Sequence, residues 1–141
     1  MSQSILITGP ITNELISEMI SNIGGKTESG GHSIFIGQVR ADVINGKKIR
    51  SIDYSAYEEM VKVEADKIKD IVLTEFSDAK TIDIIHSTGV VLAGEISLFV
   101  IVSAGHRKDA IMACSTAVEL IKERFPVWKK EIFEDNSYLW K

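Results

Sequence analysis

Cysteine is almost absent from this sequence, because Cys114 is the single one in 141 residues. One cysteine cannot form a disulfide within the chain, and it cannot build a zinc site of several thiolates. The sequence also lacks the run of about 20 apolar residues that a membrane-spanning helix needs. Its first ten residues, MSQSILITGP, carry no basic segment and only a short apolar one. We therefore expect no signal peptide and a cytoplasmic location.

An excess of basic charge is missing as well. Lys and Arg together number 16 against 20 Asp and Glu, which gives a formal net charge of −4. Nonspecific nucleic-acid binding requires a basic face that neutralises phosphates, so this balance argues against it. The three histidines show no spacing typical of metal ligands, and we expect no metal site. Walker, GxGxxG and GxSxG motifs are also absent from the sequence.

Hydrophobic residues, in contrast, make up 45% of the chain, which is enough for one domain over residues 1–141 with a core of its own. Apolar spacing predicts helices over residues 11–23, 57–76 and 107–125. Alternating or continuous apolar runs predict strands over residues 4–7, 33–39, 49–56, 80–86, 90–92, 96–103 and 127–133, with a final short segment that ends at Trp140. This order predicts an α+β fold, an antiparallel-rich mixed sheet with about three helices packed on it.

Several local patterns refine this prediction. The pair Asn45-Gly46 tolerates positive φ and predicts a hairpin between strands 33–39 and 49–56. Residues 96–103 are apolar throughout and predict a central strand that is buried on both faces. On the last helix, Lys122 lies at the edge of the apolar stripe at about 100° per residue. We expect that stripe to consist of Ile111, Cys114, Val118, Ile121 and Phe125.

His106 and Arg107 follow the apolar run directly, in the stretch LFVIVSAGHRKDAIMA. They lie where the strand gives way to the last helix, and the free N–H groups at a helix N-terminus favour an anion. An Arg at that end is unfavourable unless something negative compensates it. Either an anionic ligand binds there, or the turn is solvated and Asp109 compensates.

Four further basic residues are candidates for chemistry or anion binding. Arg40 follows a strand and could bind a phosphate or carboxylate through two hydrogen bonds. Lys129 and Lys130 alternate on one strand, so they point to opposite faces. A lysine held in a partly dry site has a lowered pKa and can move protons or attack an acyl carbon. The alternatives assign these lysines no function. Lys122 would pack its apolar stem and expose its ammonium to solvent, and Lys129 and Lys130 would be ordinary lysines of an edge strand.

Five segments together resemble the large subunit of molybdopterin synthase. They are FIGQVR at 35–40, YSAYEEM at 54–60, HSTGVVLAGE at 86–95, VSAGHRKDA at 102–110 and PVWKKE at 126–131, and they occur in the order of that family. The resemblance runs from about Gly31 to Trp140 and implies the family's hammerhead-like fold. It also implies a homodimer of this chain at the centre of a heterotetramer.

The resemblance implies an activity, too. Members of the family convert cyclic pyranopterin monophosphate to molybdopterin by installing two sulfurs as a dithiolene. The sulfur comes from a small ubiquitin-like subunit whose C-terminal Gly-Gly carries a thiocarboxylate, and no metal or organic cofactor takes part. Carried over by position, the catalytic residues are Lys122 and Lys129, while Arg40, His106 and Arg107 bind the substrate phosphate.

Two other functions are compatible with the same residues. The chain could be a non-catalytic scaffold that binds a ubiquitin-like tail or an anionic metabolite. It could also be a small ligand-binding module unrelated to pterins. An inactive relative would be expected to lose Lys122 or Lys129, and both are present. The sequence therefore favours the sulfur-transfer enzyme.

Overall fold

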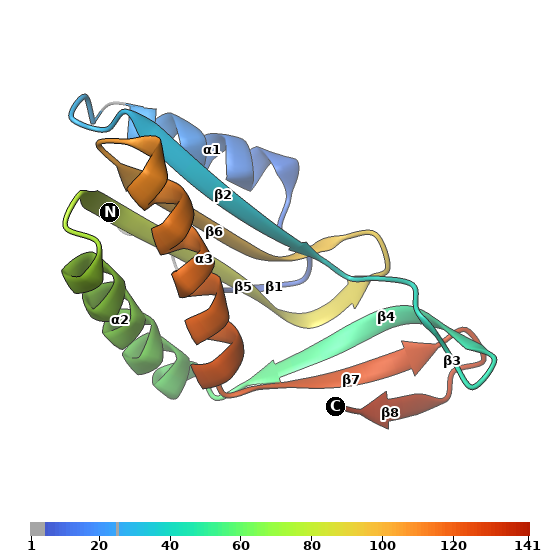
Figure 1. The fold of residues 1–141 in the computed structure, drawn as a ribbon. Coiled ribbons are helices and arrows are strands. Elements are labelled where there is room, and N and C mark those ends of the chain that lie inside the picture. The colour runs from blue at the N-terminus through green and yellow to red at the C-terminus, as the bar shows by residue number, and fades with distance from the viewer. Residues whose placement is uncertain (1–4, 25) are drawn as a thin grey trace.

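The computed structural model describes residues 5–24 and 26–141 (Figure 1). The elements follow one another as β1 (Leu6–Thr8), α1 (Asn13–Gly24), β2 (Gly31–Gln38), β3 (Val43–Ile44), β4 (Lys47–Ala56), α2 (Glu58–Glu75), β5 (Ala79–Leu92), β6 (Ile96–Ala104), α3 (Arg107–Arg124), β7 (Val127–Phe133) and β8 (Tyr138–Trp140). The three predicted helices are confirmed to within a few residues at each end. Of the strand predicted over residues 4–7, Ser4 lies outside the described residues.

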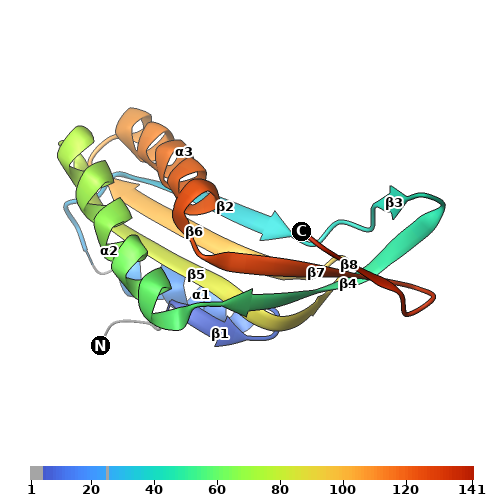
Figure 2. The same ribbon diagram turned by 90° about the horizontal axis from the view of Figure 1, so that it is seen from below.

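The strands form a mixed sheet in the order β2-β6-β5-β4-β7-β8, with β1 beside β5 and β3 beside β4. The β1–β5 pair is parallel and the other pairs are antiparallel, which confirms the predicted antiparallel-rich α+β architecture. Strand β5 is continuous where the sequence predicted two strands. Its first part pairs with β6 and its last residues, Gly89–Leu92, pair with β4. It therefore joins the helix-covered part of the sheet to an arm made of β4, β7 and β8 (Figures 1 and 2).

Helices cover both faces of the first part of the sheet. Helices α2 and α3 pack on one face and α1 on the other, as Figure 2 shows. Strand β6 supplies both cores, because Leu98, Val100 and Val102 point to α2 and α3 while Phe99 and Ile101 point to α1. The predicted central strand that is buried on both faces is thus confirmed.

The predicted hairpin is correct in its turn and wrong in its strands. Asn45 and Gly46 both have positive φ and close a hairpin, but that hairpin joins β3 to β4. Strand β2 pairs with β6 instead, and a bulge between Gly37 and Gln38 ends the regular pairing. The two residues of β3 complete the tight turn, and β2 is left free to pair with the strongly apolar β6.

The predicted stripe on α3 needs one correction, at Ile111. This residue is 59% exposed, whereas the helix lies against the sheet through Ala110, Ala113 and Ala117, all of which are buried. Alanines allow the closest approach between a helix and a sheet, so they form the centre of the contact. Ile111 then lies at the edge of the buried stripe, on the same side as Lys122.

Candidate active site

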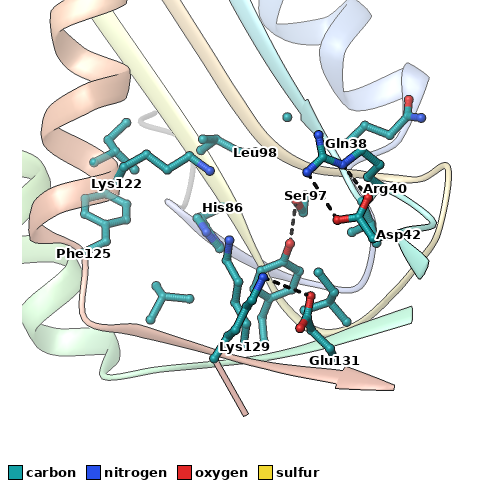
Figure 3. Close-up of a pocket in the computed structure, with 17 residues that line it drawn as sticks. Gln38, Arg40, Asp42, His86, Ser97, Leu98, Lys122, Phe125, Lys129 and Glu131 are labelled. Carbon is teal, nitrogen blue, oxygen red and sulfur yellow. Dashed lines mark hydrogen bonds and ion pairs between the residues drawn. The ribbon is translucent and has the colours of Figure 1, made fainter. Parts of the chain in front are cut away.

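A cavity of about 350 Å³ lies where the arm meets the helix-covered part of the sheet (Figure 3). The elements that enclose it are the end of β2 and the loop after it, β4, β5, β6, the end of α3, and β7. Its charged and polar lining consists of Gln38, Arg40, Asp42, Tyr54, His86, Ser97, Lys122, Lys129, Glu131 and Lys141. Four cationic side chains thus meet two carboxylates, and the cavity favours an anionic ligand.

Three of the five predicted site residues line this cavity. Lys122 reaches it from the last turns of α3, Lys129 from β7, and Arg40 from the loop that follows β2. Pro126 lies between α3 and β7 and ends the helix, and the lysines on either side of it line the same space. The geometry brings together residues that the sequence separates by as many as 89 positions.

The pKa of Lys129 is lowered, first because burial penalises the ammonium and then because Lys122 and Lys141 repel it. Glu131 opposes this shift. A lysine with a lowered pKa gives up its proton more readily near neutral pH than an exposed lysine does. Lys129 is therefore suited to donate a proton or to attack a carbonyl carbon.

Lys130 faces away from the cavity, as the alternation of the strand predicts. Its Nζ lies 4.1 Å from the centre of the Tyr138 ring and 5.7 Å from that of Trp140, both on β8. These cation–π contacts hold the ammonium on the outer face of the arm. Lys129 and Lys130 are adjacent in the chain, yet only Lys129 shares a cavity with Lys122.

Arg40 is held by a nearby carboxylate. Its Nε donates to Asp42 Oδ1 at 2.6 Å, and one terminal nitrogen donates to Oδ2 at 3.3 Å. The Arg40 side chain is otherwise largely exposed at the rim of the cavity. The guanidinium is thus oriented before a ligand arrives, with part of its donor set still open to an anion.

The floor of the cavity holds two buried polar residues of the arm. Tyr54 donates from its hydroxyl to Ser97 Oγ at 3.0 Å, and burial raises its pKa, against the effect of that hydrogen bond and with a further contribution from Glu131. Glu131 is only 4% exposed, its Oε2 lies 3.7 Å from Lys141 Nζ, and its Oε1 has no hydrogen-bond partner among the described residues. That oxygen is available to a ligand or to water.

His106 and Arg107 lie at the other end of α3. About 15 residues separate them from Lys122, which at 1.5 Å per residue corresponds to about 22 Å. His106 contacts Asp78, with its backbone N–H at 2.7 Å and its Nδ1 at 3.2 Å from Oδ2. Partial burial would raise the pKa of Asp78, but the His106 hydrogen bonds outweigh it and the pKa is lowered. Within one chain, this pair does not line the cavity.

The sequence did not single out most of the remaining lining residues as members of a site. His86 was one of three histidines without a metal-like spacing, and Tyr54 occurs only within one of the segments that carry the family resemblance. One available signal was the alternation on β7, which places Glu131 on the same face as Lys129. His86 carries no such signal, because its place in the site depends on α3 and β7, which come later in the chain.

The described residues hold no cluster of three His, Cys, Asp or Glu side chains that could bind a metal ion. Among the same residues, no helix has both the length and the apolar composition to cross a membrane.

Comparisons with known proteins agree on one family. Residues 8–124 match the sequence model of the family described as MoaE protein. The molybdopterin synthase catalytic subunit of Drosophila pseudoobscura pseudoobscura is 40% identical over 136 residues, which cover 96% of this chain and 36% of the relative. The corresponding protein of Dictyostelium discoideum is 39% identical over 110 residues, which cover 77% of this chain and 69% of the relative. The chain thus spans about a third of the length of the Drosophila relative.

Solved structures extend the likeness to the whole fold. Molybdopterin synthase from Staphylococcus aureus superimposes with a TM-score of 0.85 and 32% identity, over 100% of this chain and 98% of that one. A complex of subunits 1 and 2 of the molybdopterin-converting factor from Helicobacter pylori shares the fold with a TM-score of 0.79, at 21% identity and over 96% and 87% of the two chains. With its sequence matched over residues 8–124 and its fold matched over its full length, the chain belongs to the MoaE protein family.

Proposed function

We propose that this chain is the catalytic subunit of a molybdopterin synthase. It would transfer sulfur from the thiocarboxylated Gly-Gly tail of a small ubiquitin-like subunit to cyclic pyranopterin monophosphate and form the dithiolene of molybdopterin. The observation that carries the proposal is the shared cavity of Lys122, Lys129 and Arg40, with its excess of cations. Both the cyclic phosphate and the donor tail are anionic, so the cavity is complementary to the two reactants.

Each side chain then has a role that fits its position. Arg40, at the rim and already oriented by Asp42, binds the phosphate of the pterin. Lys122 and Lys129, which enter the same cavity, hold the thiocarboxylate tail and supply protons as its sulfur attacks and the cyclic phosphate opens. The lowered pKa of Lys129 supports its role as the proton donor.

The roles of His106 and Arg107 require a second copy of the chain, because both lie about 22 Å along α3 from Lys122. Strand β2 provides a suitable contact: it ends the described sheet, and Ile34 and Ile36 on it are exposed. Its first residue, Gly31, lies against Arg107, while its last residues line the cavity. Two β2 strands paired antiparallel about a two-fold axis would bring the partner's His106 and Arg107 to the cavity.

A direct assay tests the proposed activity. The chain is mixed with the pyranopterin substrate and with a ubiquitin-like partner that carries a C-terminal thiocarboxylate, and product is detected by pterin fluorescence after oxidation. The matched control is the same partner with an ordinary carboxylate, which can bind but cannot deliver sulfur. Product that depends on the thiocarboxylate supports the proposal. Binding of both ligands without product would support the scaffold function instead.

Mixed dimers test the contribution of the second copy. Lys129→Ala and Arg107→Ala chains are unfolded together and refolded as a mixture, and activity is measured at a pterin concentration so low that each variant alone is strongly impaired. If the partner's Arg107 completes the cavity, mixed dimers contain one intact site, and the mixture regains about a quarter of the parent activity. No recovery would mean that Lys129 and Arg107 act from the same chain.

The cytoplasmic location remains a prediction in the same proposal.

A further inference from the structure

His86 is a buried imidazole in the wall of the cavity. It lies on β5, is 8% exposed, and faces the space that Lys122 and Lys129 also enter (Figure 3). Two rings fix its orientation: Tyr54 contacts it edge-on, with centroids 5.3 Å apart, and Phe125 lies tilted at 6.3 Å. A residue that is only a packing element would present carbon atoms to the cavity, whereas this ring presents a polar nitrogen.

The tautomer of His86 follows from its backbone contact. Nδ1 lies 2.7 Å from the carbonyl oxygen of Ser87. A carbonyl oxygen can only accept, so Nδ1 carries a proton and donates it. In the neutral ring, Nε2 then has a free lone pair and is an acceptor. Ser87 therefore determines which nitrogen of His86 is left for the cavity.

The surroundings of His86 keep it neutral. Burial lowers its pKa most, the Ser87 carbonyl opposes this, and the charges of Lys129 and Lys122 lower the pKa further. The titratable and charged groups that line the same cavity are Tyr54 on β4, Lys122 on α3, Lys129 and Glu131 on β7, Arg40 and Asp42 after β2, and Lys141. The two carboxylates in this set already have cationic partners, Arg40 and Lys141.

We propose that His86 is the positioning residue of Lys129: the two side chains enter the same cavity, where the neutral Nε2 can accept a hydrogen bond from the Lys129 ammonium and fix that group for the reaction. The inference rests on the proposed function for its catalytic consequence, but the shared cavity and the effect of the Lys129 charge on His86 are properties of the chain alone. A protonated His86 would lose the acceptor and would place a third cation beside two lysines. The lysine would then be repelled from the position in which it meets the substrate.

The contact is tested without any substrate. The side-chain nitrogens of a 15N-histidine-labelled chain are followed by NMR as a function of pH. We expect His86 in the Nδ1–H tautomer, and we expect Lys129→Met to raise its pKa because a neighbouring positive charge has been removed. Lys130→Met is the matched control, since that lysine lies on the other face of β7, and it should leave the titration of His86 unchanged. An Nε2–H tautomer, or a titration that Lys129→Met does not move, would overturn the proposal.

The functional consequence is tested with two substitutions of His86. Phenylalanine keeps the ring that packs between Tyr54 and Phe125 but removes the acceptor, and glutamine restores an acceptor without a titrating group. Single-turnover rates should fall on the order of 10- to 100-fold in His86→Phe, as expected when a catalytic group is displaced by about 1 Å. His86→Gln should recover part of that loss and should lack the fall in rate that protonation of His86 causes at acid pH.

A folded His86→Phe variant with parent-like turnover would reject the positioning role and would leave the proposed sulfur transfer intact. If His86→Phe does not fold, the NMR titration and the His86→Gln pH profile decide the question. If the parent chain itself forms no product, the proposed function fails, and the NMR result still decides whether the Lys129 charge acts on His86.

Discussion

Lys122 and Lys129 lie seven positions apart in the chain, on two different elements, and line the same cavity. The shared cavity predicts that loss of either ammonium stops the same reaction. Lys122→Ala and Lys129→Ala should each lose on the order of 10²–10⁴ in single-turnover rate at saturating thiocarboxylated partner, because each removes a positioned proton donor. Both variants should still fold and still bind the partner.

Lys130→Ala is the control for these two variants. Its ammonium contacts Tyr138 and Trp140 on the outer face, so the substitution should change stability slightly and turnover by no more than a few-fold. A strongly impaired Lys130→Ala, or a near-normal Lys129→Ala, would contradict the assignment of the catalytic lysine on β7.

Arg40→Ala should weaken binding of the pterin substrate more than binding of the partner. A charged hydrogen-bonding contact contributes about 1.5–3 kcal/mol, so the dissociation constant should rise on the order of 10- to 100-fold. Arg107→Ala should also weaken pterin binding more than partner binding. This effect requires the dimer, because only there does the Arg107 of the second copy reach the cavity. Separate titrations of the two ligands measure both effects. Equal losses for pterin and partner would remove the phosphate assignment.

The chain should be a dimer that forms through β2. Ile34→Lys and Ile36→Lys introduce charge on the exposed edge of that strand and should shift sedimentation at micromolar concentration towards the monomer. Leu92→Lys is a matched control, because Leu92 is similarly exposed but lies on β5. A monomeric parent chain would contradict the dimer, and β2 variants that remain dimeric would place the interface elsewhere.

Stability should decrease as the pH falls below the ordinary pKa of histidine, 6.5, and His86 should contribute to that decrease. The folded state lowers the pKa of His86, so between the folded pKa and 6.5 the unfolded chain binds more protons than the folded chain. Unfolding is then favoured by acid, and stability is regained as pH rises to 6.5. Urea unfolding midpoints at about pH 7 and pH 5 measure the slope, which should be smaller in His86→Gln. An unchanged slope would contradict the buried, neutral state of His86.

The sequence was a good guide wherever one local pattern has a single interpretation. The uninterrupted apolar run of residues 96–103 predicts a strand that is buried on both faces, and β6 is that strand. The alternation of Lys129 and Lys130 predicted side chains on opposite faces of one strand, and only Lys129 lines the cavity.

The choice of strand partners was harder, because it depends on residues far apart in the chain. The Asn45-Gly46 turn specifies that a hairpin forms there, but not that β2 leaves it to pair with β6 some 60 residues later. Ile111 was misplaced for a related reason. A periodicity weighted by side-chain size favours isoleucine, whereas contact with the sheet favours the alanines that allow close approach.

The candidate site, too, could be predicted from the sequence only in part. The separation of Arg107 from Lys122 follows from helix length alone and could have been predicted, since both belong to one continuous helix. His86 could not have been identified in this way. Its proposed role depends on the Ser87 carbonyl, on the ring of Tyr54 and on a lysine from β7. No spacing in the sequence indicates that these groups lie close together in the fold.

The outer face of the arm gives the molecule a built-in optical probe. Both tryptophans of the chain, Trp128 and Trp140, lie there and are about half exposed. The intrinsic emission should therefore be red-shifted and readily quenched by acrylamide. A ligand that enters the cavity on the opposite face of β7 should change this emission little, whereas any protein that covers the outer face should shift it to the blue and protect it from the quencher. Fluorescence can thus distinguish occupation of the cavity from association at the arm in the same sample.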